Sequence, residues 1–169
     1  MKKAEEGLSV ASNQSQPGQG FDSRSARDLP VPGIWVERHA DVPDEAVVLY
    51  VYGGTFVLNR GPMHEVIGGK IAVHGRARVL CCDYRLAPEN PFPAAIEDVA
   101  AVYEALLEQG HGSDKIVLMG DTAGCAIALS ALLLPSERDI SLPAGFVALC
   151  PIADLNFPGG SYVTQFVRC

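Results

Sequence analysis

The stretch from Lys115 to Leu134, KIVLMGDTAGCAIALSALLL, constrains the fold of this chain more than any other part of the sequence. An apolar run with β-branched residues enters a Gly-x-x-x-Gly segment at Gly120–Gly124. The chain leaves that segment as an apolar sequence rich in alanine and leucine, which favour helix. The stretch therefore predicts a strand, a tight turn and a helix in immediate succession.

The alternation of strand and helix continues along the chain. Strands are predicted at Ile34–Arg38, Ala46–Tyr52, 77–85, 114–120 and 144–151, and helices at 64–75, Ala94–Gln109 and Ala123–Leu134. Such alternation indicates right-handed βαβ units. We therefore expect an α/β fold with a mostly parallel sheet of about five strands and helices on both faces. Sites in such sheets lie beyond the carboxyl ends of the strands, which here are the loops Tyr52–Leu58, Asp83–Pro93 and Gly120–Gly124.

The composition limits the kinds of partner. The chain has 169 residues, enough for one domain, and a net charge of −7 without any cluster of Lys or Arg. Because binding to phosphate groups needs concentrated positive charge, we expect no nucleic-acid partner. No apolar stretch approaches the roughly 20 residues that span a bilayer, and no apolar segment typical of a signal peptide follows Met1. We expect a cytoplasmic protein without a membrane span.

The five cysteines show no CxxC spacing and no matching histidines, and they are Cys81, Cys82, Cys125, Cys150 and Cys169. This pattern does not favour metal binding, so we expect no metal site. The first four lie in apolar segments predicted as strand or helix. Buried, reduced thiols are the interpretation that we prefer for them.

The residues Gly120-Asp121-Thr122-Ala123-Gly124 match the pattern G-x-S-x-G, with threonine in place of serine. In that pattern a nucleophilic hydroxyl stands at the tip of a turn so sharp that only small residues fit two places to either side. The tip residue has a strained backbone and lies at the N-terminus of the following helix. An ordinary glycine-rich turn between strand and helix is the alternative interpretation.

A second glycine-rich segment, Tyr52-Gly53-Gly54-Thr55-Phe56, follows a predicted buried strand. Lipases and esterases carry an HGGG loop at this place, whose backbone N–H groups stabilise a developing oxyanion. A flexible strand exit is the alternative. A phosphate-binding loop is not favoured, because the segment contains neither G-x-G-x-x-G nor G-K-[ST].

Four blocks of sequence follow one another as YVYGGTFVLNRGPMH, CCDYRLAPENPFPAAIEDV, GDTAGCAIALSALLL and LPAGFVALCPIADL. Together they resemble the hormone-sensitive-lipase-like branch of the α/β-hydrolases, whose members typically read HGGGF, DYRLAPE with FPAA, GDSAGG and SPW-DL. The resemblance covers roughly residues 34 to 162, and DYRLAPENPFPAA is its most specific part.

The resemblance implies a role for each residue that matches a family motif. Thr122 stands at the nucleophile position, in an elbow that also contains Gly120, Asp121 and Gly124. The backbone N–H groups of Gly54, Thr55 and Ala123 would form the oxyanion hole. Tyr52 replaces the histidine of the family's loop.

The resemblance also implies hydrolysis of carboxylic esters without a cofactor. We therefore expect no cofactor, and a small-molecule ester or carboxylate as the ligand. Residues 1–33 would be a polar N-terminal tail by their composition or a partial cap by the resemblance, and the resemblance makes residues 34–169 the N-terminal part of an α/β-hydrolase domain.

The chain departs from the family pattern in two ways. Thr122 replaces serine, and its methyl group crowds a tip that already needs unusual backbone angles. The triad of this fold runs nucleophile, acid, base along the chain, but no histidine follows Thr122, since His39, His64, His74 and His111 all precede it. The sequence ends at Cys169, shortly after the last predicted strand, so we expect an incomplete, C-terminally truncated α/β-hydrolase fold.

Other polar residues near the motifs are given structural roles. Asp121, Asp139 and Asp154 are interpreted as surface or capping aspartates, and His64 as a packing or helix-capping residue. The strand predicted at 144–151 would leave an exposed apolar edge, which favours self-association.

Three hypotheses about function remain open. The chain is a weak carboxylesterase-type hydrolase that acts through Thr122, or one that is completed by residues from elsewhere. Alternatively it binds a small molecule without turnover, as do the gibberellin receptors of plants, which resemble the same branch. In the third hypothesis it is a truncated pseudoenzyme without activity of its own.

Overall fold

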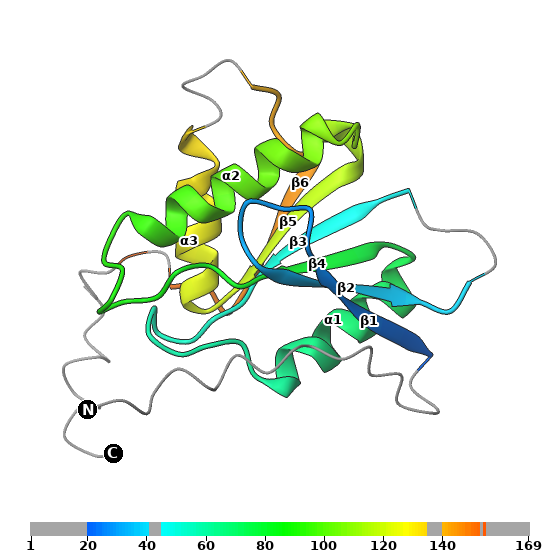
Figure 1. The fold of residues 1–169 in the computed structure, drawn as a ribbon, viewed down its shortest axis with the longest axis horizontal. Helices are drawn as coiled ribbons and strands as arrows, with labels where there is room; N and C mark the ends of the chain where they lie inside the picture. The colour runs from blue at the N-terminus through cyan, green and yellow to red at the C-terminus, as the bar shows by residue number, and fades with distance from the viewer. Residues whose placement is uncertain (1–19, 41–44, 135–139, 153, 155–169) are drawn as a thin grey trace.

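The computed structural model describes residues 20–40, 45–134, 140–152 and 154. Strands and helices alternate along them from β3 onwards, as Figure 1 shows. The bounds of the elements are β1 Phe21–Ala26, β2 Gly33–Arg38, β3 Val47–Val51, α1 Pro62–Gly75, β4 Arg78–Cys82, α2 Ala94–Glu108, the short 3-10 helix η1 Ser113–Lys115, β5 Ile116–Asp121, α3 Ala123–Ala131 and β6 Gly145–Leu149.

The strands form one six-stranded sheet in the order β1-β2-β4-β3-β5-β6. The four strands β4, β3, β5 and β6 pair in parallel, whereas β1 and β2 pair antiparallel. The predicted α/β fold with a mostly parallel sheet is therefore confirmed. The sheet has one strand more than the expected five, because β1 adds to its edge beside β2.

β1 lies inside the segment that the sequence predicts to be a tail, so the described part of that tail contains a strand. Its sequence FDSRSA has almost no apolar run, but Phe21 is buried against α1. A Cβ atom built on Gly69 of α1 would lie 2.2 Å from the Phe21 ring, so this glycine makes room for the phenylalanine. Arg24 of β1 and Arg78 of β4 both pair with Glu37 of β2, which links the three strands.

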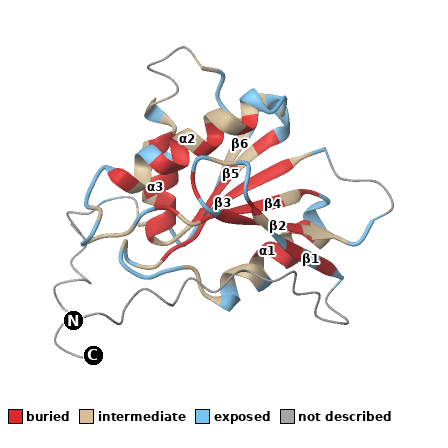
Figure 2. Ribbon diagram, in the orientation of Figure 1, coloured by how far each residue is buried: buried red, intermediate tan, exposed pale blue. Residues whose placement is uncertain are grey.

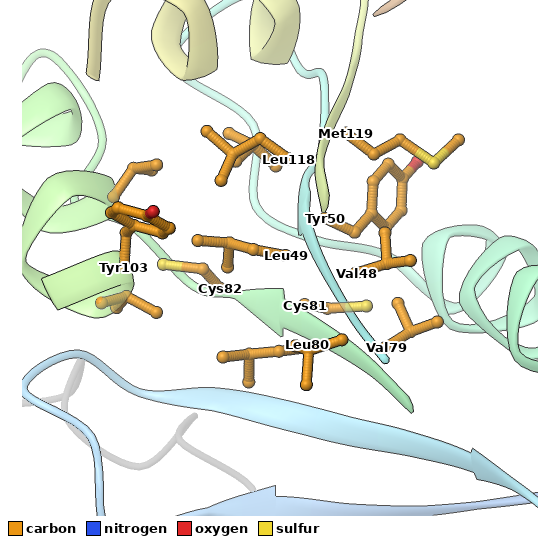
Figure 3. Close-up of a cluster of buried hydrophobic side chains, with 14 of the residues drawn as sticks. Val48, Leu49, Tyr50, Val79, Leu80, Cys81, Cys82, Tyr103, Leu118 and Met119 are labelled. Atoms are coloured by element: carbon orange, nitrogen blue, oxygen red, sulfur yellow. The ribbon is translucent and has the colours of Figure 1, made fainter. Parts of the chain in front are cut away.

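Helices cover both faces of the sheet (Figure 1). α1 packs against β2 and β4 on one face, and α3 packs against β5 and α2 on the other. Successive side chains of a strand point to opposite faces. Figure 3 accordingly shows two groups in the core, one with Val48, Tyr50, Val79, Cys81 and Met119 and the other with Leu49, Leu80, Cys82, Tyr103 and Leu118.

Burial decreases from the centre of the sheet toward β6. All five residues of β3 are buried, in keeping with a strand that is covered on both faces. In β6, Val147 and Leu149 are 43% and 41% exposed. Figure 2 shows this contrast between the central strands and β6. None of the helices in the described ranges is long and apolar enough to cross a membrane.

The parallel strands bring three loops to one edge of the sheet. The loop after β3 contacts the loop after β4, because the N–H of Ala87 donates to the carbonyl of Phe56 at 3.0 Å. The loop after β3 also contacts the turn after β5, because the N–H of Gly53 donates to the Asp121 carboxylate. The fold therefore brings the three loops that the sequence singles out to the same edge.

Candidate active site

The turn between β5 and α3 holds Thr122 in an unusual backbone conformation. Its φ is 52° and its ψ is −117°, a region that is strained for a β-branched residue. The N–H of Thr122 donates to the carbonyl of Leu149 at 2.9 Å, and its carbonyl accepts from the N–H of Ile152 at 3.1 Å. The end of β6 and the chain just after it thus bind the N–H and the carbonyl of Thr122.

The glycines on either side of Thr122 are required by close packing. A Cβ atom on Gly120 would lie 2.7 Å from the backbone nitrogen of Cys125. A Cβ atom on Gly124 would lie 2.1 Å from the carbonyl oxygen of Val51, in the neighbouring strand. These distances agree with the expectation that any side chain two places from the tip would strike the adjacent strand or helix.

The glycine loop after β3 packs directly against this turn. A Cβ atom on Gly53 would lie 3.0 Å from the Cβ of Thr122 and 2.6 Å from Oδ2 of Asp121, so only glycine fits there. Gly54 has a φ of 147°, and Thr55 and Phe56 have φ values of 50° and 66°. The carbonyl of Gly54 accepts from the N–H groups of Val57 and Leu58, which closes the loop.

Three N–H groups at this junction have no hydrogen-bond acceptor among the described residues. They belong to Gly54 and Thr55 of the glycine loop and to Ala123, the first residue of α3. Ala123 is fully buried, and an α-helix leaves its first N–H groups without partners inside the helix. These N–H groups are therefore not engaged by another described residue.

Asp121 is not the surface or capping aspartate that the sequence suggests. Its carboxylate is half-buried, and Oδ1 accepts from the Tyr50 hydroxyl at 2.7 Å and from the Gly53 N–H at 2.9 Å. Oδ2 accepts from the Thr122 hydroxyl at 3.3 Å. Burial, followed by the hydrogen bond to Asp121, raises the pKa of Tyr50 well above its usual value, which keeps its hydroxyl a donor.

Tyr52, the first residue of the glycine loop, packs against His64 of α1. The Tyr52 ring is fully buried, stacks on Tyr84 with 4.6 Å between ring centroids, and contacts the His64 ring at 5.2 Å. Nδ1 of His64 accepts from the N–H of Gly61 at 2.9 Å, at the start of α1. The predicted helix-capping role of His64 is confirmed.

No imidazole among the described residues forms a hydrogen bond with the Thr122 hydroxyl, whose one such bond goes to Asp121. His39 pairs with Asp22, His64 caps α1 and His111 lies beside Trp35. Of the other two aspartates, Asp154 is exposed and Asp139 lies outside the described residues. The described residues also contain no group of three His, Cys, Asp or Glu side chains that could hold a metal ion.

A groove of about 270 Å³ lies beside the turn, between α3 and β6. Cys125, Leu129, Phe146 and Ile152 are among the residues that line it. Its lining is mainly apolar, and it begins one turn of helix after Thr122. The groove could therefore hold an apolar group close to the turn.

The comparisons with known proteins point to one family. A family model described as alpha/beta hydrolase fold matches residues 48–166. An acetyl-hydrolase of Streptomyces hygroscopicus is 38% identical over 125 residues, which are 74% of this chain and 42% of that protein. An esterase of Acinetobacter venetianus is 32% identical over 115 residues, which are 68% of this chain and 38% of that protein.

A solved structure gives the same result. The crystal structure of an esterase from the bacterial hormone-sensitive lipase family matches with a TM-score of 0.81 and 36% identity, over 88% of this chain and 50% of that one. The chain thus spans half or less of the length of these relatives. It belongs to the α/β-hydrolase fold family, in the hormone-sensitive-lipase-like branch.

Proposed function

We propose that this chain carries the nucleophile and the oxyanion-binding groups of a carboxylic-ester hydrolase. The observation that carries the proposal is Thr122, held at a φ of 52° on a turn against which Gly53 packs without room for a Cβ atom. In this proposal the Thr122 hydroxyl oxygen attacks the ester carbonyl carbon, the alcohol leaves, and water then releases the acid from the acyl-threonine.

The N–H groups without an acceptor support the part of the proposal that concerns oxyanion binding. Attack on the ester carbon turns the carbonyl oxygen into an oxyanion, which needs donors that are already in place. The N–H groups of Gly54, Thr55 and Ala123 have no acceptor among the described residues, and Gly53, next to them in the chain, packs against Thr122. We assign them to the oxyanion.

Turnover by these 169 residues is proposed to be slow. Loss of the central triad members lowers kcat by roughly 10⁴–10⁶-fold in hydrolases of this type. Here no imidazole among the described residues meets the Thr122 hydroxyl, and no histidine follows Thr122 in the sequence. A backbone strain of about 1–3 kcal/mol at Thr122, if it misaligns the transition state, adds a loss of roughly 10–100-fold.

The cellular location of the protein is part of the same proposal. The four described cysteines form no disulfide; Cys81, Cys82 and Cys125 are buried as expected, whereas Cys150, directly after β6, is exposed and the expectation of burial is wrong for it. Unpaired thiols persist in the reducing cytoplasm, which supports a cytoplasmic location.

The test is hydrolysis of p-nitrophenyl acetate and p-nitrophenyl butyrate by purified protein. We expect the parent chain to exceed Thr122→Ala, and Thr122→Ser to exceed the parent by roughly 10–100-fold as the methyl group is removed. Ser113→Ala is the control, since Ser113 loses a hydroxyl at the opposite end of β5. Equal rates for the parent, Thr122→Ser and Thr122→Ala would remove Thr122 from the chemistry.

A further inference from the structure

The carboxylate of Asp121 joins three separate parts of the fold. Its Oδ1 takes the hydroxyl of Tyr50 from β3 at 2.7 Å and the N–H of Gly53 from the glycine loop at 2.9 Å. Asp121 itself is the last residue of β5 and precedes Thr122. One oxygen atom therefore ties the glycine loop to the end of β5, directly before Thr122.

Each of the two donors is held by other parts of the molecule. Tyr50, near the C-terminal end of β3, is fully buried, and its backbone pairs with Met119 of β5. Figure 3 shows its side chain next to that of Met119, within the core. Gly53 is confined by the turn itself, since a Cβ atom there would lie 2.9 Å from the Asp121 carbonyl oxygen. The carboxylate is therefore bound to a rigid side chain on one side and to a loop on the other.

The glycine loop has few other ties at this point. Among the described residues, the backbone hydrogen bonds of Gly54 close the loop on itself, toward Val57 and Leu58. Two other bonds tie the loop to the segment after β4: the Tyr84 hydroxyl donates to the Tyr52 carbonyl at 2.6 Å, and the N–H of Ala87 donates to the carbonyl of Phe56 at 3.0 Å. Among the described residues, the hydrogen bond from Gly53 to Asp121 is thus the bond that ties the loop to the turn at Thr122.

We propose that Asp121 is a positioning residue, which holds the N–H groups of the glycine loop at the right distance from the Thr122 hydroxyl by accepting from Gly53 and Tyr50. This rests on the proposed function, because those N–H groups matter to the reaction only if Thr122 attacks an ester. A shift of about 1 Å in a group that positions the transition state can lower the rate by about 100-fold.

Hydrogen exchange of single amides, followed by NMR on the ¹⁵N-labelled chain, tests the proposal without requiring turnover. In Asp121→Ala the Gly53 amide should exchange about 10–100-fold faster, the effect expected for loss of a hydrogen bond to a carboxylate. Asp121→Asn should restore slow exchange, because its amide oxygen accepts from the same two donors. Tyr50→Phe removes one of the two hydrogen-bond donors to Oδ1 of Asp121, so the Gly53 amide should exchange at an intermediate rate.

Two controls separate local positioning from general loss of stability. The Leu80 amide lies in the buried strand β4. In all three variants its exchange rate should change only as much as the global stability of the protein changes. Asp98→Asn alters a buried carboxylate that binds Arg85 instead of the glycine loop, and it should leave the Gly53 amide slow. Unchanged exchange at Gly53 in Asp121→Ala, equal acceleration at Gly53 and Leu80, or failure of Asp121→Asn to restore protection would overturn the proposal.

Hydrolysis of p-nitrophenyl butyrate by the same proteins separates this proposal from the proposed function. We expect kcat to fall about 10–100-fold in Asp121→Ala and to recover in Asp121→Asn, while KM changes little. If the parent chain is no faster than Thr122→Ala, the proposed function fails. The exchange of the Gly53 amide still decides whether Asp121 positions the loop.

Discussion

At the level of single residues, the tip of the turn combines a β-branched side chain with a backbone conformation that is strained for it. Thr122 is held there from both sides by the backbone of Leu149 and Ile152. Its hydroxyl donates to Asp121 at 3.3 Å, a long bond that leaves the oxygen free to meet another group. The residue is thus fixed by its backbone, while its hydroxyl remains weakly bound.

Tyr52 is a second residue whose environment is unusual. Its hydroxyl is buried and lies near the backbone of Arg60, but it forms no hydrogen bond with any described residue. Burial, followed by the charge of Asp83, raises the pKa of Tyr52 well above its usual value. An unpaired hydroxyl in the interior destabilises the folded state.

We predict that Tyr52→Phe stabilises the chain by about 1 kcal/mol, because it removes the unpaired hydroxyl and keeps the ring that stacks on Tyr84. The matched control is Tyr84→Phe. The Tyr84 hydroxyl donates to the Tyr52 carbonyl at 2.6 Å, so its removal should cost about 1 kcal/mol. Urea unfolding of the three proteins measures both effects, and a loss of stability in Tyr52→Phe would contradict the prediction.

Much of the site geometry follows from local sequence. The spacing of Gly120 and Gly124 predicts the sharp turn, because the steric demand of such a turn involves only neighbouring residues. The role of Asp121 does not follow from the sequence. It depends on the parallel pairing of β3 with β5, which brings Tyr50 and Gly53 to Asp121, and no local pattern specifies which strands become neighbours.

At the level of secondary structure elements, burial explains which ones the sequence predicts. β3 and β4 are apolar runs buried on both faces, and α2 presents one apolar face, so their patterns are strong. β1 is an edge strand in which only Phe21, Ser23 and Ala26 are buried, and its polar composition gives no strand pattern in the sequence. Gly68 and Gly69 in the middle of α1 weaken the helical pattern, yet they allow α1 to approach Cys81 and Phe21 closely.

β6 is the element for which we propose an interaction with a second copy of the chain. Within the described residues it pairs with β5 only, and Val147 and Leu149 are 43% and 41% exposed. Strand edges of this kind pair readily with other strands, and an added lysine opposes such pairing.

We predict that the apparent mass of the chain rises with concentration in sedimentation velocity experiments. Val147→Lys should weaken this association by about tenfold or more, because a lysine at the interface would have to be desolvated. Met63→Lys is the control, since Met63 is 65% exposed but lies on α1 and not on a strand edge. A parent chain that stays monomeric, or equal effects of the two variants, would argue against association through β6.

At the level of the whole molecule, the described residues form one sheet that brings the glycine loop, the turn at Thr122 and the chain after β6 to the same edge. The chain corresponds to half or less of each relative. Thr122, the proposed nucleophile, and the proposed oxyanion donors lie within this half. An imidazole beside Thr122 does not occur among the described residues.

Reaction with an alkyl fluorophosphonate, mapped by mass spectrometry of peptides, can identify the nucleophile of this chain. The hydroxyl oxygen at position 122 would bond to phosphorus, fluoride would leave, and the proton would pass to solvent. We predict a slow adduct on Thr122 in the parent chain, an adduct formed roughly 10–100-fold faster in Thr122→Ser, and none on the corresponding peptide of Thr122→Ala. Adducts confined to other residues, or no adduct at position 122 in either hydroxyl-bearing protein, would contradict the assignment of Thr122 as the nucleophile.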